Sequence, residues 1–154
     1  MRSPTFKSAA FSNKSKEIEL VYTSGKRVTL LYASLNLKKK IQRVWVDRET
    51  KGKSVGMEFE DGLVDYLPYD QPLAIVKDPE YILQNHIERI TAQIKDEIAR
   101  QKIPRRFLAR QLKTSENQIQ KLLNPEILNK NLGQLYKMVS LLGLECEIQI
   151  RKAA

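Results

Sequence analysis

Apolar and polar residues alternate through much of the first half of the chain, which is the pattern of β-strands with one buried face. The proline residues Pro68, Pro72 and Pro79 then break regular structure and mark the exit from these strands. We therefore expect an antiparallel β-sheet domain over residues 17–78. The candidate strands lie at 18–22, 28–32, 41–47, 55–59 and 63–67.

Two short segments between the alternating runs carry turn signals. The first is Thr23-Ser24-Gly25 and the second is Asp61-Gly62. Asp-Gly between two alternating runs predicts a two-residue hairpin with a type I′ turn, because that turn requires positive φ at both central residues. A small β-sheet of this kind needs no functional site of its own.

The second half of the chain has apolar residues at helical spacings of three and four. One stripe runs from Leu83 to Ile98, and another from Leu132 to Leu142 is closed by Gly143. Residues 144–150 alternate again, which predicts a half-buried C-terminal strand with Cys146 on its apolar face. The expected fold is α+β, with a four- to five-helix bundle and this strand over residues 79–154.

Within the bundle, the pattern of residues 108–123 predicts a short helix, a tight turn and a second short helix. Apolar residues at Leu108, Leu112, Ile119 and Leu122 let both helices bury one edge. Ser115 is placed to cap the second helix by accepting a hydrogen bond from the backbone near Gln118. The remaining face is polar and can hydrogen-bond base edges in a DNA major groove; it consists of Glu116, Asn117, Gln120 and Lys121.

The charge distribution favours an anionic partner, above all nucleic acid. The net charge is +9, and residues 98–123 hold seven basic side chains against one acid. Residues 1–16 carry four basic side chains and no acid, so a flexible basic arm is expected there. A lone cysteine suits a reducing cytoplasm, and neither a signal peptide nor a membrane span is expected.

Opposite charges also separate within the β half. Residues 38–53 hold seven bases against two acids, whereas residues 57–80 hold seven acids against one base. This separation predicts either a dipolar surface for a protein partner or cross-strand pairs that neutralise each other.

Residues 105–123 resemble the helix-turn-helix of the Cro/Xre-type phage-repressor family. The resemblance extends over about residues 81–150 and includes Ala109, Ile119 and the Leu-Leu-Gly-Leu run at 141–144. The trailing strand is similar to that of antitoxin-like members. Lys113 stands where the family often has glycine, at a cost of about 1 kcal/mol in a left-handed turn. The first half is similar only to small uncharacterised β domains found beside such motifs.

This resemblance implies that the second motif helix enters the major groove of double-stranded DNA. It implies base contacts from Glu116, Asn117, Gln118, Gln120 and Lys121. It also implies phosphate contacts from Arg105, Arg106, Ser115, Lys130 and Asn131. The expected function is transcriptional regulation by a homodimer on two half-sites about one helical turn apart.

Two other functions remain open: an antitoxin that binds its promoter and a toxin, and a protein-interaction module without DNA binding. No catalytic, metal or cofactor site is expected. His86 is the sole histidine and has no cysteine nearby in the sequence, so a metal site or a catalytic dyad with Cys146 is disfavoured. Trp45, between basic and apolar neighbours, can stack a base, although such a residue more often belongs to a core or interface.

Overall fold

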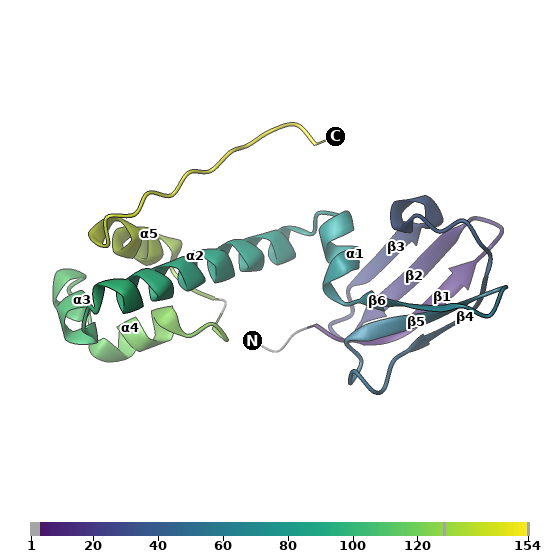
Figure 1. The fold of residues 1–154 in the computed structure, drawn as a ribbon, viewed down its shortest axis with the longest axis horizontal. Helices are drawn as coiled ribbons and strands as arrows, with labels where there is room; N and C mark the ends of the chain where they lie inside the picture. Colours follow the sequence, from purple (N-terminus) through teal and green to yellow (C-terminus); the bar gives the residue numbers. More distant parts are fainter. Residues whose placement is uncertain (1–3, 128, 154) are drawn as a thin grey trace. The chain divides into compact units, whose positions relative to one another are not determined.

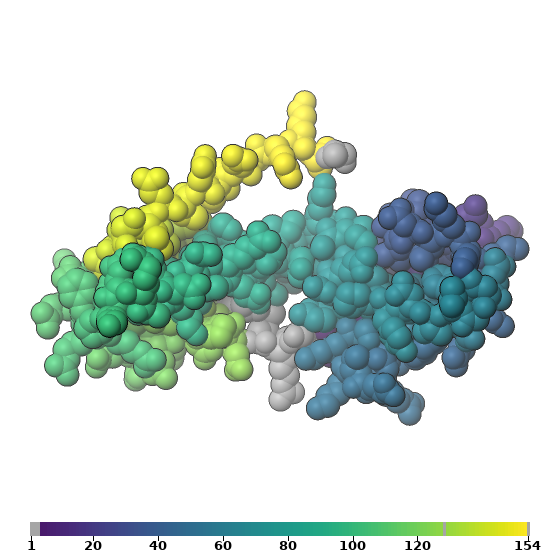
Figure 2. All heavy atoms as spheres, viewed as in Figure 1, coloured from purple at the N-terminus to yellow at the C-terminus, as the bar shows by residue number. Residues whose placement is uncertain are grey.

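The computed structural model describes residues 4–127 and 129–153 of the 154-residue chain. Contacts between residues divide it into two units, one ending at Ile82 and the other beginning at Leu83 (Figure 1, Figure 2). Strands dominate the first unit and helices the second, which confirms the expected α+β class.

Six strands in the described part of the first unit form two antiparallel sheets, ordered β1-β2-β3 and β4-β5-β6 (Figure 1). A 3₁₀ helix, η1 (Tyr32–Leu35), follows the first sheet, and a short helix, α1 (Asp70–Ile75), follows the second. The strands are β1 (Phe6–Ser12), β2 (Glu17–Tyr22), β3 (Arg27–Leu31), β4 (Ile41–Val46), β5 (Ser54–Phe59) and β6 (Val64–Pro68).

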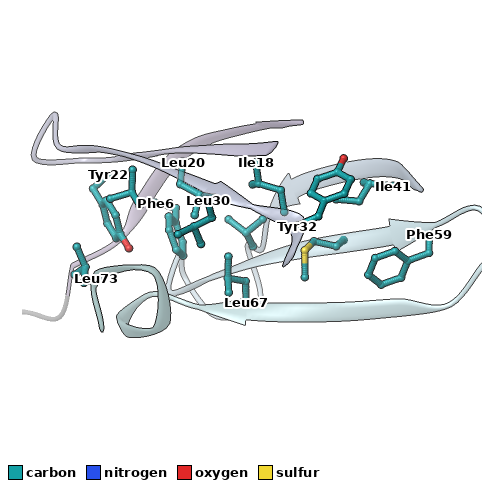
Figure 3. Packing of buried hydrophobic residues seen from close by; sticks show 13 residues of the cluster. Phe6, Ile18, Leu20, Tyr22, Leu30, Tyr32, Ile41, Phe59, Leu67 and Leu73 are labelled. Carbon is teal, nitrogen blue, oxygen red and sulfur yellow. The ribbon is translucent and has the colours of Figure 1, made fainter. Parts of the chain in front are cut away.

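Both sheets contribute to one hydrophobic core, and Figure 3 shows their inward side chains pointing toward one another. The alternating residues Ile18, Leu20 and Tyr22 of β2 are all fully buried, as their period of two predicted. Each such side chain contributes roughly 1.5–3 kcal/mol when buried. The Tyr22 hydroxyl donates to the carbonyl of Tyr69 at 2.7 Å, and burial raises the pKa of this phenol.

The prediction of a flexible arm over residues 1–16 is wrong for residues 6–12, which form β1. Phe6 is buried and stacks on Tyr22 with ring centroids 4.7 Å apart. The strand pairs antiparallel with β2, whose edge would otherwise lack a hydrogen-bonding partner. The basic segment therefore forms a strand, because the burial of Phe6 and the pairing with the edge of β2 stabilise it. Residues 1–3 lie outside the described residues.

The two turns between alternating runs have the same three-residue form. In the second, the N–H of Phe59 donates to Leu63 at 2.9 Å and the N–H of Gly62 donates to Phe59 at 2.9 Å. Gly62 has a φ of +83°, whereas Asp61 does not have positive φ. The predicted type I′ turn is therefore wrong: the loop holds three residues and needs a glycine only at its last position.

Two ion pairs connect the basic segment 38–53 with the acidic segment 57–80. Lys39 pairs with Asp61, and the Nε of Arg43 lies 3.1 Å from a carboxylate oxygen of Glu58. The hydrogen bond from Lys39 lowers the pKa of Asp61. Of the two interpretations of this charge pattern, mutual neutralisation across strands is the one these contacts favour.

Four helices make up the described regular structure of the second unit: α2 (Pro79–Gln101), α3 (Arg105–Gln111), α4 (Glu116–Leu123) and α5 (Leu132–Leu141). The division between units falls in the first turn of α2 rather than before it. The predicted apolar stripe of α2 is buried at Ile87, Ile90 and Ile94, whereas Leu83 is exposed. These side chains join residues of α3, α4 and α5 in a second hydrophobic core.

Lysine rather than glycine ends three of the helices. Lys77, Lys102 and Lys113 follow α1, α2 and α3 with φ values of +55°, +56° and +53°. After α3, the N–H of Thr114 donates to the carbonyl of Ala109 at 2.9 Å, and Lys113 donates to Arg110 at 3.3 Å, which is a Schellman motif. The positive charge at a helix C-terminus offsets part of the left-handed strain.

Substituting Lys113→Gly is expected to raise the free energy of unfolding by up to about 1 kcal/mol, because glycine adopts positive φ without steric strain. Denaturant unfolding followed by circular dichroism measures the change. The matched control is Lys137→Gly, an exposed site inside α5, which should lose about 1 kcal/mol. A loss of stability at both positions would contradict the left-handed turn.

The predicted strand over residues 144–150 is not formed. α5 ends as expected at Gly143, with a φ of +75°, but residues 144–153 have no regular secondary structure. Figure 2 shows them running out from α5 as an extended segment, and Ile150 is 94% exposed. Cys146 is exposed rather than buried. An alternating segment becomes a strand only when a second strand satisfies its backbone, and the described residues supply none.

Candidate nucleic-acid interface

The segment from Arg105 to Leu123 folds as two short helices, α3 and α4, joined by a tight turn. Pro104 precedes α3 in an extended conformation, where its missing N–H removes no helical hydrogen bond. Ser115 caps α4, as predicted, because its hydroxyl accepts from the N–H of Gln118 at 3.2 Å. Local interactions at Pro104 and Ser115 thus fix where α3 and α4 begin.

One face of α4 is buried in the helical core. Ile119 and Leu122 are both buried, and Leu108 of α3 is buried in the same cluster. Since these apolar positions are fixed in the core, the polar residues of α4 face outward. This is the arrangement that the spacing of apolar residues predicted for the pair of helices.

The outward face of α4 presents every residue predicted to contact bases. Asn117 and Lys121 are one turn apart and lie opposite the buried Ile119 and Leu122 on the helix. Gln118 flanks this pair on one side, with Gln120 and Glu116 on the other, and all five side chains are exposed. A polar ridge with donors and acceptors therefore stands clear of the protein core.

Three arginines of α3 lie beside the start of this ridge. Arg105, Arg106 and Arg110 line an open depression together with Pro104, Phe107 and Glu116. All three are exposed, and no ion pair among the described residues involves them. Their guanidinium groups are therefore available to an outside anion.

Arg110 was missed by sequence reasoning, although a signal for it was present. Arg106 and Arg110 are four residues apart in a predicted helix, so they share a face. Glu116 is the acid of this region and sits in the first turn of α4, where the helix dipole favours a negative charge.

Lys130, predicted to contact phosphate, is half-buried and forms a hydrogen bond within the helical unit. Its Nζ donates to the hydroxyl of the buried Thr91 at 3.0 Å. Burial lowers the pKa of Lys130, and the nearby positive charge of Lys95 lowers it further. Because this hydrogen bond and partial burial account for the position of the Lys130 ammonium group, we leave Lys130 out of the candidate interface.

Ser115 and Asn131, also predicted to contact phosphate, both act as helix caps. Asn131 begins α5 and its side-chain oxygen accepts from the N–H of Gln134 at 3.2 Å. Both residues are exposed, so the Ser115 hydroxyl hydrogen and the Asn131 amide nitrogen can still donate outward. Helix capping is by itself a sufficient reason for serine at position 115 and asparagine at position 131, whether or not DNA binds there.

Comparison with known proteins adds no assignment: no family model, curated protein or solved structure matches this chain. Among the described residues, none of the helices combines the length and apolar character needed to cross a membrane. Within the same residues, no group of three or more histidine, cysteine and acidic side chains is placed to hold a metal ion.

Proposed function

We propose that the chain binds double-stranded DNA in a sequence-specific manner through α3 and α4 and regulates transcription. The observation that supports this proposal most directly is the exposed polar ridge of α4, opposite its buried face. Beside it lie three arginines that form no ion pair with any described residue. On this proposal the second unit is a Cro/Xre-type helix-turn-helix. No enzymatic activity is proposed.

The side chains of α4 suit base edges in the major groove, which is about 12 Å wide and admits a helix. Asn117 can bind adenine through its amide, and Lys121, one turn on, can donate to guanine. Glu116 can accept from a cytosine amino group. Arg105, Arg106 and Arg110 would contact phosphates, which supplies affinity and register but no sequence information.

We further propose that two copies act together on half-sites about one helical turn apart. The alternating segment 144–150 supports this arrangement, because Ile148 and Ile150 are exposed and the segment pairs with no strand of the described chain. Antiparallel pairing of this segment with its counterpart in a second copy would bury both apolar rows. The proposed location is the cytoplasm, where Cys146 would remain reduced.

Changing both Asn117→Ala and Lys121→Ala should abolish sequence preference, because both residues lie on the face of α4 that is opposite its buried side chains. Selection from random duplexes with the unmodified chain identifies the preferred site. Electrophoretic mobility shift with this site and a scrambled duplex, each at two salt concentrations, then measures the preference. The double variant should bind both duplexes alike.

Arg105→Ala provides the matched contrast. Losing one phosphate contact should weaken both duplexes equally and reduce the slope of log affinity against log salt by about one unit. If neither variant changes duplex retention while both remain folded by circular dichroism, the assignment of α3 and α4 to DNA is wrong.

The two alternative functions predict different outcomes. The antitoxin alternative rests on the charge separation in the β half, which would offer a surface to a toxin. The pairs Lys39–Asp61 and Arg43–Glu58 neutralise part of this charge and therefore weaken that argument. A protein-interaction module without DNA binding predicts no selected duplex at all. The selection experiment therefore distinguishes a protein-interaction module from the two hypotheses that include DNA binding.

A further inference from the structure

A row of three residues crosses the outer face of the sheet β4-β5-β6. In the strand register Trp45 is opposite Gly56, and Gly56 is opposite Tyr66. The core-facing residues of these strands are their neighbours, including Val55, Met57 and Leu67. Because side chains alternate along a strand, Trp45 and Tyr66 therefore project from the opposite face.

Gly56 makes this arrangement possible. A Cβ atom at position 56 would overlap the indole ring of Trp45, so the ring lies directly over the glycine. The rings of Trp45 and Tyr66 then meet edge to face, with centroids 6.3 Å apart and an interplanar angle of 85°. Trp45 is partly buried in this position, whereas Tyr66 is 53% exposed. The two rings form a corner on the surface.

Basic side chains surround this aromatic corner. Lys7, Arg43 and Arg48 line the same open depression as Trp45 and Tyr66. Lys7 and Arg48 are exposed and take part in no ion pair within the described chain, whereas Arg43 is paired with Glu58.

Only one of the two acids that line the depression is exposed beside these basic groups. One carboxylate oxygen of Asp47 accepts from the N–H of Glu49 at 3.1 Å, and the other accepts from the Ser54 hydroxyl at 3.2 Å. Asp47 is 9% exposed, so Glu49 is the exposed acid of the lining. The outer part of the depression therefore has more positive than negative groups.

We propose that this surface, the aromatic corner of Trp45 and Tyr66 with its basic rim, binds single-stranded nucleic acid. A base would stack on Tyr66 with its edge toward Trp45, while Lys7 and Arg48 would contact the backbone phosphates. Aromatic side chains beside cations are the combination that holds unpaired bases, since every base has a stacking face. A duplex cannot use the corner, because its bases are already stacked within the helix.

The geometry argues against a cationic ligand. The guanidinium of Arg43 already lies 4.4 Å from the centroid of the Trp45 ring, in the place that a quaternary ammonium group would take. The surrounding Lys7 and Arg48 would repel a second cation.

Trp45 is the sole tryptophan of the chain, so its fluorescence reports on the proposed site. The full chain is titrated with a short oligothymidylate and a short oligouridylate, which lack secondary structure, and the emission of Trp45 is recorded. Anisotropy of a labelled oligonucleotide gives the affinity independently. We expect the oligonucleotide to quench or shift the emission, and Tyr66→Ala to weaken binding by roughly 5- to 100-fold.

Charge reversals provide a matched pair. Arg48→Glu should weaken binding and reduce its salt dependence, whereas Lys38→Glu, an exposed site outside the depression, should have a much smaller effect. Tyr66 and Arg48 are exposed, so these variants keep the core, and thermal unfolding checks this.

The proposal fails if neither oligonucleotide binds. It also fails if binding leaves Trp45 emission unchanged and is insensitive to Tyr66→Ala. A third contrary result is binding that disappears in the Asn117→Ala, Lys121→Ala variant but survives Tyr66→Ala, since the helical unit would then be the site. Duplex selection tests α4 separately, so either proposal can fail alone.

Discussion

Replacing Arg106 and Arg110 together by glutamate is expected to weaken duplex binding on the order of a hundred-fold at low salt. Each arginine would lose a phosphate contact, and each new carboxylate would repel the same phosphates. The slope of log affinity against log salt should fall by about two units, since each contact accounts for roughly 0.9 of the slope. Fluorescence anisotropy with the selected duplex over a salt series measures both quantities.

The control is the pair Arg89→Glu and Lys137→Glu, exposed sites on α2 and α5 of the same unit that do not line the depression. This control changes the net charge by the same amount, so any difference between the two double variants reports the position of the charges. Equal losses in the two double variants would mean that the net charge of +9, and not the α3 surface, governs binding.

Substituting Gly56→Ala is expected to destabilise the chain by about 1–3 kcal/mol. One methyl group would overlap the indole ring of Trp45, which must leave its position over the strand and lose its contacts with Arg43 and Tyr66. Strand propensity alone predicts the opposite sign, because alanine in a strand interior is favoured over glycine by roughly 0.5–1 kcal/mol. Denaturant unfolding followed by tryptophan fluorescence gives the sign directly.

A double-mutant cycle identifies the cause. In a Trp45→Ala background, Gly56→Ala should be nearly neutral or stabilising, because no ring remains to overlap the new methyl group. Circular dichroism replaces fluorescence in this background, since the chain then lacks tryptophan. If the cost of Gly56→Ala is the same with and without the indole, the close approach of ring and glycine is not its origin.

Local interactions explain which predictions agree with the structure. The buried alternation of Ile18, Leu20 and Tyr22, the cap at Ser115 and the helix end at Gly143 each depend on residues within a few positions along the chain. The division of α4 into a buried and a polar face likewise follows from a period of 3.6 residues. For these elements the type and the buried face were therefore predictable from the sequence.

Contacts between distant segments explain what the sequence could not reveal. β1 forms because Phe6 packs on Tyr22, and the neighbourhood of Trp45, Gly56 and Tyr66 depends on the register of three strands. Lys130 is half-buried and donates a hydrogen bond to Thr91, which lies 39 positions earlier.

The sequence by itself thus determined strands β2 to β6, helices α2 to α5 and their caps, because hydrogen bonding and side-chain periodicity act over about one turn or one strand. The tertiary structure decided which cations face outward, whether an alternating segment finds a partner, and which surface residues meet. Such contacts close long loops, and their stability comes from burial and pairing that no short stretch of residues encodes.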